Sequence, residues 1–220
     1  MLYFLKEVDI MLIEKSGLTI LNEIDSSSPT PGGGSISALV GALGICLSRM
    51  YGHLSVNKKK FLSLDESIQS KFISSFNELE TYKNILVECI DEDCNAYDAF
   101  MRAYRLPKNS DDEIRVRQLE LDKATLIAIQ SPYNIMVQSL KAIELCNQMI
   151  EHGNVFAISD LACGVIFLDS AIQAAALNVQ INLASLNDND KEEWTFKMNE
   201  VMNKSHELKE SIVNQIKEKL

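Results

Sequence analysis

Apolar residues recur every three or four positions along most of the chain, which is the spacing of an amphipathic α-helix. The clearest run extends from Ser67 to Tyr104, and a second, from Asp111 to Ile150, contains Pro132, where we expect a kink or break. A third run, Ile158 to Leu186, is apolar almost all round, which predicts the central and most buried helix. Alternating runs typical of strands are nearly absent, so the pattern predicts an all-α bundle of long antiparallel helices.

Both ends of the chain add to this bundle. Residues 1–17 have the pattern of an N-terminal amphipathic helical extension that packs on the bundle or on a partner, and residues 191–220 form a charged C-terminal helix. A length of 220 residues fits one domain. We therefore treat residues 1–220 as a single helical domain.

An unusual stretch, SSSPTPGGGSISALVGALG, separates the first segment from the bundle. If a helix begins near Ser35, then Ser37, Gly41 and Gly44 lie along one side, and small residues at this spacing let two helix backbones approach closely. The preceding glycines leave amide groups unobstructed at a helix N-terminus, where an anion or a polar ligand atom is favoured. The alternative is a plain loop in which Ser35 is the N-cap of a tightly packed helix.

Composition and charge exclude several classes of function. The formal net charge of −10 argues against a nucleic-acid partner, which requires a concentrated basic surface. Five cysteines without a disulfide or zinc pattern indicate free thiols in a reducing cytoplasm. The apolar run Gly32 to Leu47 is short for a membrane span, so we expect no membrane association. No residues have metal-ligand spacing, and we expect no metal.

Five sequence blocks resemble one enzyme family. PTPGGGSISALVGALG closely resembles the P-x-P-G-G-G-S-x-x-A-L-x-G-A-L-G signature of the cyclodeaminase/cyclohydrolase family of folate enzymes. Asn57 and Phe61 depart from the family's usual Gly and Tyr. Five blocks in the right order are more specific than any single glycine motif. The remaining blocks, in chain order, are NKKKF (57–61), DEDCNAYDAFMRAYRLPK (91–108), GNVFAISDLACGV (153–165) and NVQINLASLND (178–188).

The resemblance implies an all-helical homodimer that acts on tetrahydrofolate one-carbon units, with folate as substrate and no separate cofactor. Two reactions belong to the family. One is hydrolysis of 5,10-methenyltetrahydrofolate to 10-formyltetrahydrofolate, which we take as the leading function. The alternative is release of ammonia from formimidoyltetrahydrofolate, and a third interpretation is a helical binding or structural protein that keeps the fold without the chemistry.

Asp93 is the first candidate catalytic residue. It shares a helical face with Ala96, Tyr97 and Phe100, and an aspartate on an otherwise apolar stripe is costly unless it is paired or functional. The methenyl substrate is a delocalised cation, so a carboxylate suits it both as a countercharge and as a general base. We expect Tyr97 to contact the substrate on the same face. The alternative role for Asp93 is a buried hydrogen bond.

Asp160 is the second catalytic candidate. A helix that starts at residue 158 or 159 places Asp160 on one face with Asn178 and Asn182, which we consider as substrate-binding amides. An acid in the first turn is also ordinary helix-start chemistry. Hydrogen bonds between helices in the core are the alternative role for the two asparagines.

The substrate's anionic glutamate tail calls for donors and cations. The basic run formed by Lys58, Lys59 and Lys60 suits the tail, although such a run is also typical of a solvated face. The glycine turn suits polar atoms of the substrate through its free amides. We therefore add to the expected substrate contacts Gly32, Gly33, Gly34 and Ser35.

Overall fold

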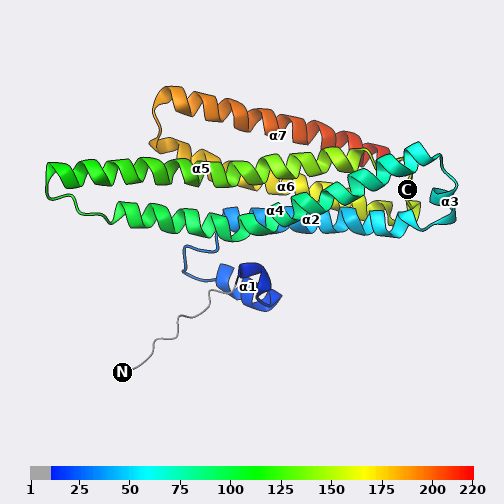
Figure 1. Cartoon of the computed structure of the whole chain (residues 1–220), viewed down its shortest axis with the longest axis horizontal. Coiled ribbons are helices and arrows are strands. Elements are labelled where there is room, and N and C mark those ends of the chain that lie inside the picture. Colours follow the sequence, from blue (N-terminus) through cyan, green and yellow to red (C-terminus); the bar gives the residue numbers. More distant parts are fainter. Residues whose placement is uncertain (1–10) are drawn as a thin grey trace.

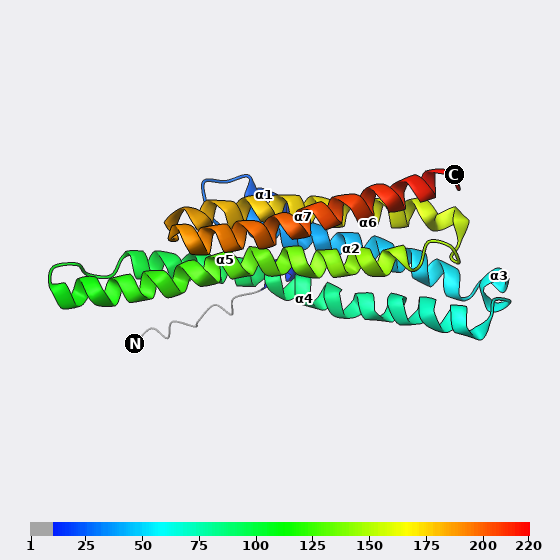
Figure 2. The same cartoon turned by 90° about the horizontal axis from the view of Figure 1, so that it is seen from above.

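Long helices make up most of the computed structural model, which describes residues 11–220 (Figures 1 and 2). The long helices are α2 (Gly33–Val56), α4 (Glu66–Tyr104), α5 (Asp111–Asn147), α6 (Ile158–Asn182) and α7 (Asp188–Lys217). Between them lie the shorter elements η1 (Leu12–Glu14), α1 (Gly17–Ile24), α3 (Lys59–Leu62), η2 (Val155–Ala157) and η3 (Leu183–Ser185). No strand occurs in residues 11–220, and the all-α prediction is confirmed.

The bundle is a ring of four helices with a fifth outside it. Helices α2, α4, α5 and α6 each pack against two neighbours in the ring, α2–α4–α5–α6, and α7 packs against α5 and α6. Neighbouring helices of the ring run in opposite directions, as predicted, and α7 is antiparallel to α6 and parallel to α5 (Figures 1 and 2). At the left end of Figure 1, α4 and α5 extend beyond α2 and α6, so their far ends are exposed to solvent on several sides.

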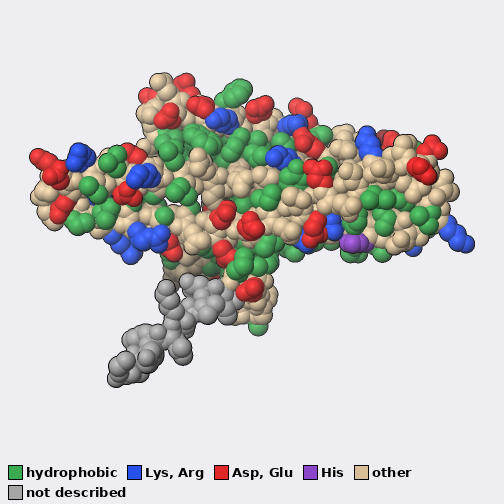
Figure 3. All heavy atoms as spheres, in the orientation of Figure 1, with side chains coloured by type: hydrophobic (Ala, Val, Ile, Leu, Met, Phe, Trp, Pro, Cys, Tyr) green, Lys and Arg blue, Asp and Glu red, His purple; other side chains and the backbone are tan. Residues whose placement is uncertain are grey.

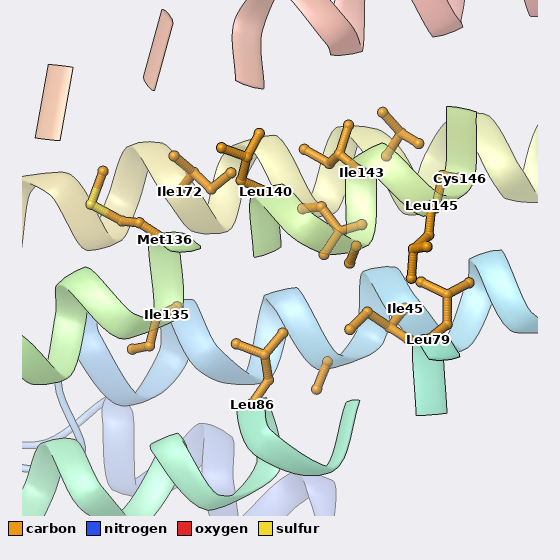
Figure 4. Close-up of a cluster of buried hydrophobic side chains, with 14 of the residues drawn as sticks. Ile45, Leu79, Leu86, Ile135, Met136, Leu140, Ile143, Leu145, Cys146 and Ile172 are labelled. Atoms are coloured by element: carbon orange, nitrogen blue, oxygen red, sulfur yellow. The ribbon is translucent and has the colours of Figure 1, made fainter. Parts of the chain in front are cut away.

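The core lies between the four ring helices (Figure 4). It is built from the apolar stripe of each helix, since branched and sulfur-containing side chains interdigitate there and are almost fully buried. Labelled examples are Ile45 of α2, Leu79 and Leu86 of α4, Ile135, Met136, Leu140 and Ile143 of α5, and Ile172 of α6.

Helices α2 and α6 approach each other through glycine. A Cβ atom on Gly44 would lie 2.7 Å from the carbonyl oxygen of Gly164, and one on Gly164 would lie 2.6 Å from the carbonyl oxygen of Gly44. Neither position has room for a side chain, so the two backbones are in direct contact. This confirms the close helix approach that the small residues of 37–44 predict.

Helix α5 is continuous through Pro132, so a break there, one of the two predicted outcomes, does not occur. Proline has no N–H to bond the carbonyl four residues earlier, which is that of Ala128. That oxygen instead accepts a hydrogen bond from Asn182 Nδ2 of α6 at 2.8 Å. A side chain from another helix thus replaces the missing bond, which helps the helix to continue.

The chain before α2 differs from the predicted N-terminal extension. Residues 1–10 of that extension lie outside the described residues. Residues 12–14 form a 3₁₀ turn, and Ser16 is the N-cap of α1, so the segment 11–17 is not the continuous helix that we predicted. The backbone N–H of Leu12 donates to Asp91 Oδ1 at 3.0 Å, which ties this segment to α4.

Two helical stretches, Gly33–Val56 and Val155–Ser185, are long and apolar enough to cross a membrane by length and composition. Half of the apolar window of each is buried inside the bundle. Exposed apolar side chains of α2 and α6 are described below.

Candidate functional site

The N-terminus of α2 is capped by a carboxylate from another helix. The helix begins at Gly33 with Gly32 as its N-cap, so it starts two residues before the predicted position, and the alternative role of Ser35 as N-cap is wrong. The backbone N–H of Ser35 donates to Asp93 Oδ2 at 2.9 Å, and Ser35 Oγ donates to the same oxygen at 3.2 Å. Asp93 therefore occupies the position where a helix N-terminus favours negative charge.

Position 34 has no room for a side chain, because the Asp93 carboxylate occupies the space that a Cβ atom would need. A Cβ atom on Gly34 would overlap all three carboxylate atoms of Asp93. A Cβ atom on Gly33 would lie 3.2 Å from Asn178 Nδ2, which is closer than most real contacts. The turn thus allows a backbone to approach a carboxylate from α4 and an amide from α6.

Asp93 is a partly buried carboxyl with a perturbed pKa. Burial raises the pKa of Asp93 above its ordinary value, and the two hydrogen bonds from Ser35 oppose that rise. A carboxyl whose pKa is raised by desolvation, at the wall of a cavity, is a candidate for proton transfer.

A cavity of about 320 Å³ opens beside this carboxylate. Its volume is at the lower end of the range for small-molecule sites. It lies between the glycine turn, the Asp93 face of α4 and the C-terminal end of α6. Its lining contains predicted site residues from three parts of the sequence, namely Gly32, Gly33, Gly34, Asp93, Tyr97, Asn178 and Asn182, together with Pro29, Thr30, Ala96, Phe100, Ala128 and Ile181.

Asp160 and the lysines 58–60 lie at the opposite ends of α6 and α2 from the Asp93 cavity. Lys58 is 24 residues from Gly34 along α2, which is about 36 Å at 1.5 Å per residue. Asp160 is in the first turn of α6 and is 18 residues, or about 27 Å, from Asn178. Within one subunit the structure does not bring Asp160 or the lysines 58–60 to the Asp93 cavity, and their roles stay predictions.

The comparisons with known proteins decide the family. A model of the formiminotransferase-cyclodeaminase family matches residues 18–203, which is most of the chain. This chain belongs to that family. The match covers the glycine turn, the Asp93 face of α4 and the C-terminal end of α6.

Individual family relatives point to two named activities. The methenyltetrahydrofolate cyclohydrolase of Methylorubrum extorquens is 34% identical over 77% of this chain and 80% of its own length. The formimidoyltransferase-cyclodeaminase of Gallus gallus is 30% identical over 80% of this chain, which spans only 32% of that longer protein. The formiminotetrahydrofolate cyclodeaminase structure from Thermotoga maritima has a TM-score of 0.76 at 22% identity, over 95% of this chain and 97% of that one. The last comparison shows the shared fold.

The two asparagines of this family member have different surroundings. Asn182 Nδ2 donates to the carbonyl of Ala128 and also to that of Asn178, at 2.8 and 2.9 Å, so the predicted alternative of an interhelical hydrogen bond is confirmed for Asn182. Asn178 Nδ2 donates within α6, to the carbonyl of Ala174 at 2.9 Å. The Asn178 side chain lies against Gly33, at the cavity wall.

Sequence reasoning missed several residues in or near the site. Cys94 follows Asp93, and its Sγ lies 3.2 Å from Ser35 Oγ, where burial raises the pKa of the thiol. Ala128 and Ile181 line the cavity without any chemical signature in the sequence. The position of Ala128, four residues before Pro132, is the one signal that could have pointed to an unpaired carbonyl there.

The part of the chain in residues 11–220 holds no group of three His, Cys, Asp or Glu side chains that could bind a metal ion. All five cysteines of the chain are free thiols in the structure. The expected absence of a metal and of a cofactor, and the cytoplasmic location, stay predictions.

Proposed function

We propose that this protein is a methenyltetrahydrofolate cyclohydrolase, which uses water to convert 5,10-methenyltetrahydrofolate to 10-formyltetrahydrofolate. The observation that carries the proposal is the Asp93 carboxylate, held by Ser35 at the wall of a cavity in a chain 34% identical to a protein of that name. Folate is the substrate, and we propose that no other cofactor takes part.

Asp93 suits two requirements of this reaction. The bridging carbon of the substrate is part of a delocalised cation, so an adjacent carboxylate stabilises the bound substrate by charge. Attack by water also requires a base to accept a proton. We propose that Asp93 accepts this proton as the new carbon–oxygen bond forms and returns it to N5 as the bond from carbon to N5 breaks. The second proton of the water is released to solvent.

The raised pKa of Asp93 is consistent with this role. A carboxylate with a higher pKa is a stronger base, and a nearby cationic substrate keeps it ionised when the site is occupied. The backbone N–H of Ser35 donates to one oxygen only, Oδ2. We propose that Oδ1 faces the reacting atoms.

The second candidate function is formimidoyltetrahydrofolate cyclodeaminase. In that reaction N10 attacks the formimidoyl carbon and ammonia leaves, so the departing nitrogen needs a proton. A carboxyl with a raised pKa is a suitable proton donor, and the bifunctional relative from Gallus gallus supports this candidate. Both candidates use the same residue and differ in the group that leaves.

We also propose that the protein is a homodimer through α2 and α6. The exposed side of α6 from 161 to 182 has no charged side chain, because Asp169 is buried, and residues 33–48 of α2 contain no charged residue. A long uncharged face on two packed helices is typical of an interface between copies, since a two-fold axis pairs the same surface with itself. The exposed apolar residues of this α2/α6 face are Leu43, Met50, Leu54, Ile166, Phe167, Leu177 and Ile181.

This dimer would also give the distant candidates a role. A two-fold axis across the midpoints of α2 and α6 would bring the Lys58 end of one subunit beside the glycine turn of the other, because those two features lie at opposite ends of α2. Under that arrangement Lys58, Lys59, Lys60 and Asp160 would act at the partner's cavity. We propose this as the arrangement that their predicted roles require.

The test is a direct assay of both substrates. We expect purified protein to abolish the near-ultraviolet absorbance of 5,10-methenyltetrahydrofolate faster than buffer does, and Asp93→Asn to remove most of that activity. Formation of the same absorbance from formimidoyltetrahydrofolate, without hydrolysis of the methenyl form, would replace the first proposal with the second. Binding without turnover of either compound would leave a non-catalytic folate-binding protein.

A further inference from the structure

A second cavity lies beside the Asp93 site, toward the far ends of α4 and α5. Its volume is about 590 Å³, and it shares Phe100 with the Asp93 cavity. Successive turns of α4 therefore line both cavities, with Asp93 and Tyr97 in the first and Tyr104 in the second. Phe100 is thus the residue at which the two cavities adjoin.

Two aromatic side chains of α4, Phe100 and Tyr104, form one wall of the second cavity. The rings of Phe100 and Tyr104 are nearly parallel, with an interplanar angle of 18° and centroids 6.5 Å apart. Tyr104 is 57% exposed. Aromatic side chains of this kind pack favourably against a flat ring.

Arg117 lies at the end of this wall. Its guanidinium carbon is 5.1 Å from the centre of the Tyr104 ring, and its Nε and Nη2 donate to the Tyr104 carbonyl oxygen at 3.2 and 3.1 Å. These bonds hold the side chain in place. Within residues 11–220 Arg117 has no carboxylate partner, and its Nη1 makes no hydrogen bond. The guanidinium is thus oriented with a donor available.

Two acids, Asp122 and Asp190, line the cavity together with Arg117. Asp122 accepts a hydrogen bond from Gln118 Nε2, and Asp190 accepts one from Asn187 Nδ2, both at 2.7 Å. In a chain with a net charge of −10, the segment 102–117 has more basic than acidic residues. Figure 3 shows both Lys or Arg and Asp or Glu side chains on the end of the molecule where α4 and α5 meet, at the left. The basic residues are Arg102, Arg105, Lys108, Arg115 and Arg117, and the acidic ones are Asp111, Asp112 and Glu113.

We propose that this second cavity binds the aminobenzoyl-glutamate part of the folate substrate, with the benzoyl ring against Phe100 and Tyr104 and a glutamate carboxylate on Arg117. The inference rests on the proposed function and names the specificity residue for the tail. The Asp93 cavity alone, at about 320 Å³, is at the small end for a drug-sized ligand, whereas the tail has the aromatic ring and the anion that the second cavity matches. Arg117 belongs to the same subunit as Asp93, unlike the lysines that the dimer arrangement requires.

The experiment compares ligands with and without the tail. Calorimetry measures the Kd of 10-formyltetrahydrofolate and of a tetrahydropterin that lacks the aminobenzoyl-glutamate. We expect Arg117→Ala to weaken binding of the tailed ligand about ten- to a hundred-fold, as for loss of a hydrogen bond between charged groups, and to leave the tail-free ligand unchanged. KM for the methenyl substrate should rise by the same factor while kcat stays within about two-fold.

Two further variants make the result specific. Tyr104→Leu keeps the backbone carbonyl that orients Arg117 but removes the ring, and it should also weaken the tailed ligand alone. The matched control is Arg115→Ala, which removes an arginine of the same helix that pairs with Asp112 and does not line the cavity, and it should leave the Kd of the tailed ligand unchanged. Equal binding of the tailed ligand by wild type and Arg117→Ala would overturn the assignment, as would an equal loss of tail-dependent affinity in Arg115→Ala.

The outcomes also separate this inference from the proposed function. Wild-type turnover together with an unaffected Arg117→Ala variant would remove the tail site and keep the enzyme. Arg117-dependent folate binding without turnover would keep the tail site and remove the activity. A wild-type protein that binds no folate would overturn both.

Discussion

Asn182 Nδ2 donates a hydrogen bond to the carbonyl oxygen of Ala128, the group that Pro132 cannot bond because proline has no N–H. This bond joins the C-terminal end of α6 to the middle of α5, and both partners line the Asp93 cavity. Pro132 thus leaves the Ala128 carbonyl of α5 free to accept a hydrogen bond that ties α6 to α5.

This relationship predicts a rescue in a double-mutant cycle. Asn182→Ala should lower the free energy of unfolding by about 1 kcal/mol, since it leaves the Ala128 carbonyl without its partner. In a Pro132→Ala background the new N–H can bond Ala128, so the same change at Asn182 should cost less. Denaturant unfolding of the four proteins measures the difference, and equal costs in both backgrounds would show that Asn182 does not compensate for the proline.

Gly34→Ala should inactivate the enzyme without unfolding it. The new methyl group would overlap the Asp93 carboxylate, which must rotate or move away from Ser35. We expect kcat to fall at least as far as a misplaced catalytic group implies, about a hundred-fold. Gly17→Ala is the matched control, because a Cβ there meets nothing within 4 Å. A Gly34→Ala variant with full activity would mean that the position of Asp93 is unimportant.

Asp93→Asn should reduce turnover and increase stability at neutral pH. Loss of a general base lowers the rate by about 10²- to 10⁴-fold. The folded-state pKa of Asp93 is raised, so the folded protein binds this proton more tightly than the unfolded chain does, and stability falls as pH rises through that pKa. Asn cannot ionise and avoids this loss. Melting curves of both proteins should coincide at low pH and separate at neutral pH, with the variant more stable. A less stable variant at neutral pH contradicts the raised pKa.

Ser35→Ala should move the acidic limb of the pH–activity profile to higher pH. The Ser35 hydroxyl donates to Asp93 and lowers its pKa, so removing it raises the pKa further above the ordinary value. Because the base must be ionised, activity is lost at a higher pH in the variant than in the wild type. The measurement is kcat/KM against pH, which reports the free enzyme. If Asp93 acts as an acid instead, its pKa governs the basic limb, and that limb should move to higher pH in the variant while the acidic limb stays in place.

Charges on the α2/α6 face should convert a dimer to monomers. Leu43 and Phe167 are exposed on this face, and Leu43→Lys or Phe167→Glu would place an unpaired charge inside the proposed interface. Phe196→Glu is the control, since Phe196 is 70% exposed but lies on α7, outside the face. Light scattering gives the mass in each case. A wild-type monomer, or a dimer that tolerates both charges, would remove the proposed interface.

The sequence by itself determined the helices, because a period of three to four apolar residues is a local property of the chain. The prediction for Ser67–Tyr104 differs from α4 by one residue, and the small residues near Gly44 correctly indicated a tight helix contact. The family signature likewise depended on blocks of adjacent residues. For these features no distant contact needed to be known.

Tertiary structure decided which chemical groups meet. Ser35 and Asp93 are 58 residues apart in the sequence. Neither segment by itself reveals that the Asp93 carboxylate caps the helix of Ser35 and excludes a side chain at Gly34. Periodicity put Asp160 on the same helical face as Asn178, but the length of α6 keeps them about 27 Å apart in one subunit. It also missed the continuity of α5, because the donor that replaces the proline's N–H comes from α6. A local pattern gives the face of a helix, whereas the packing of the helices decides which residues of different helices meet on that face.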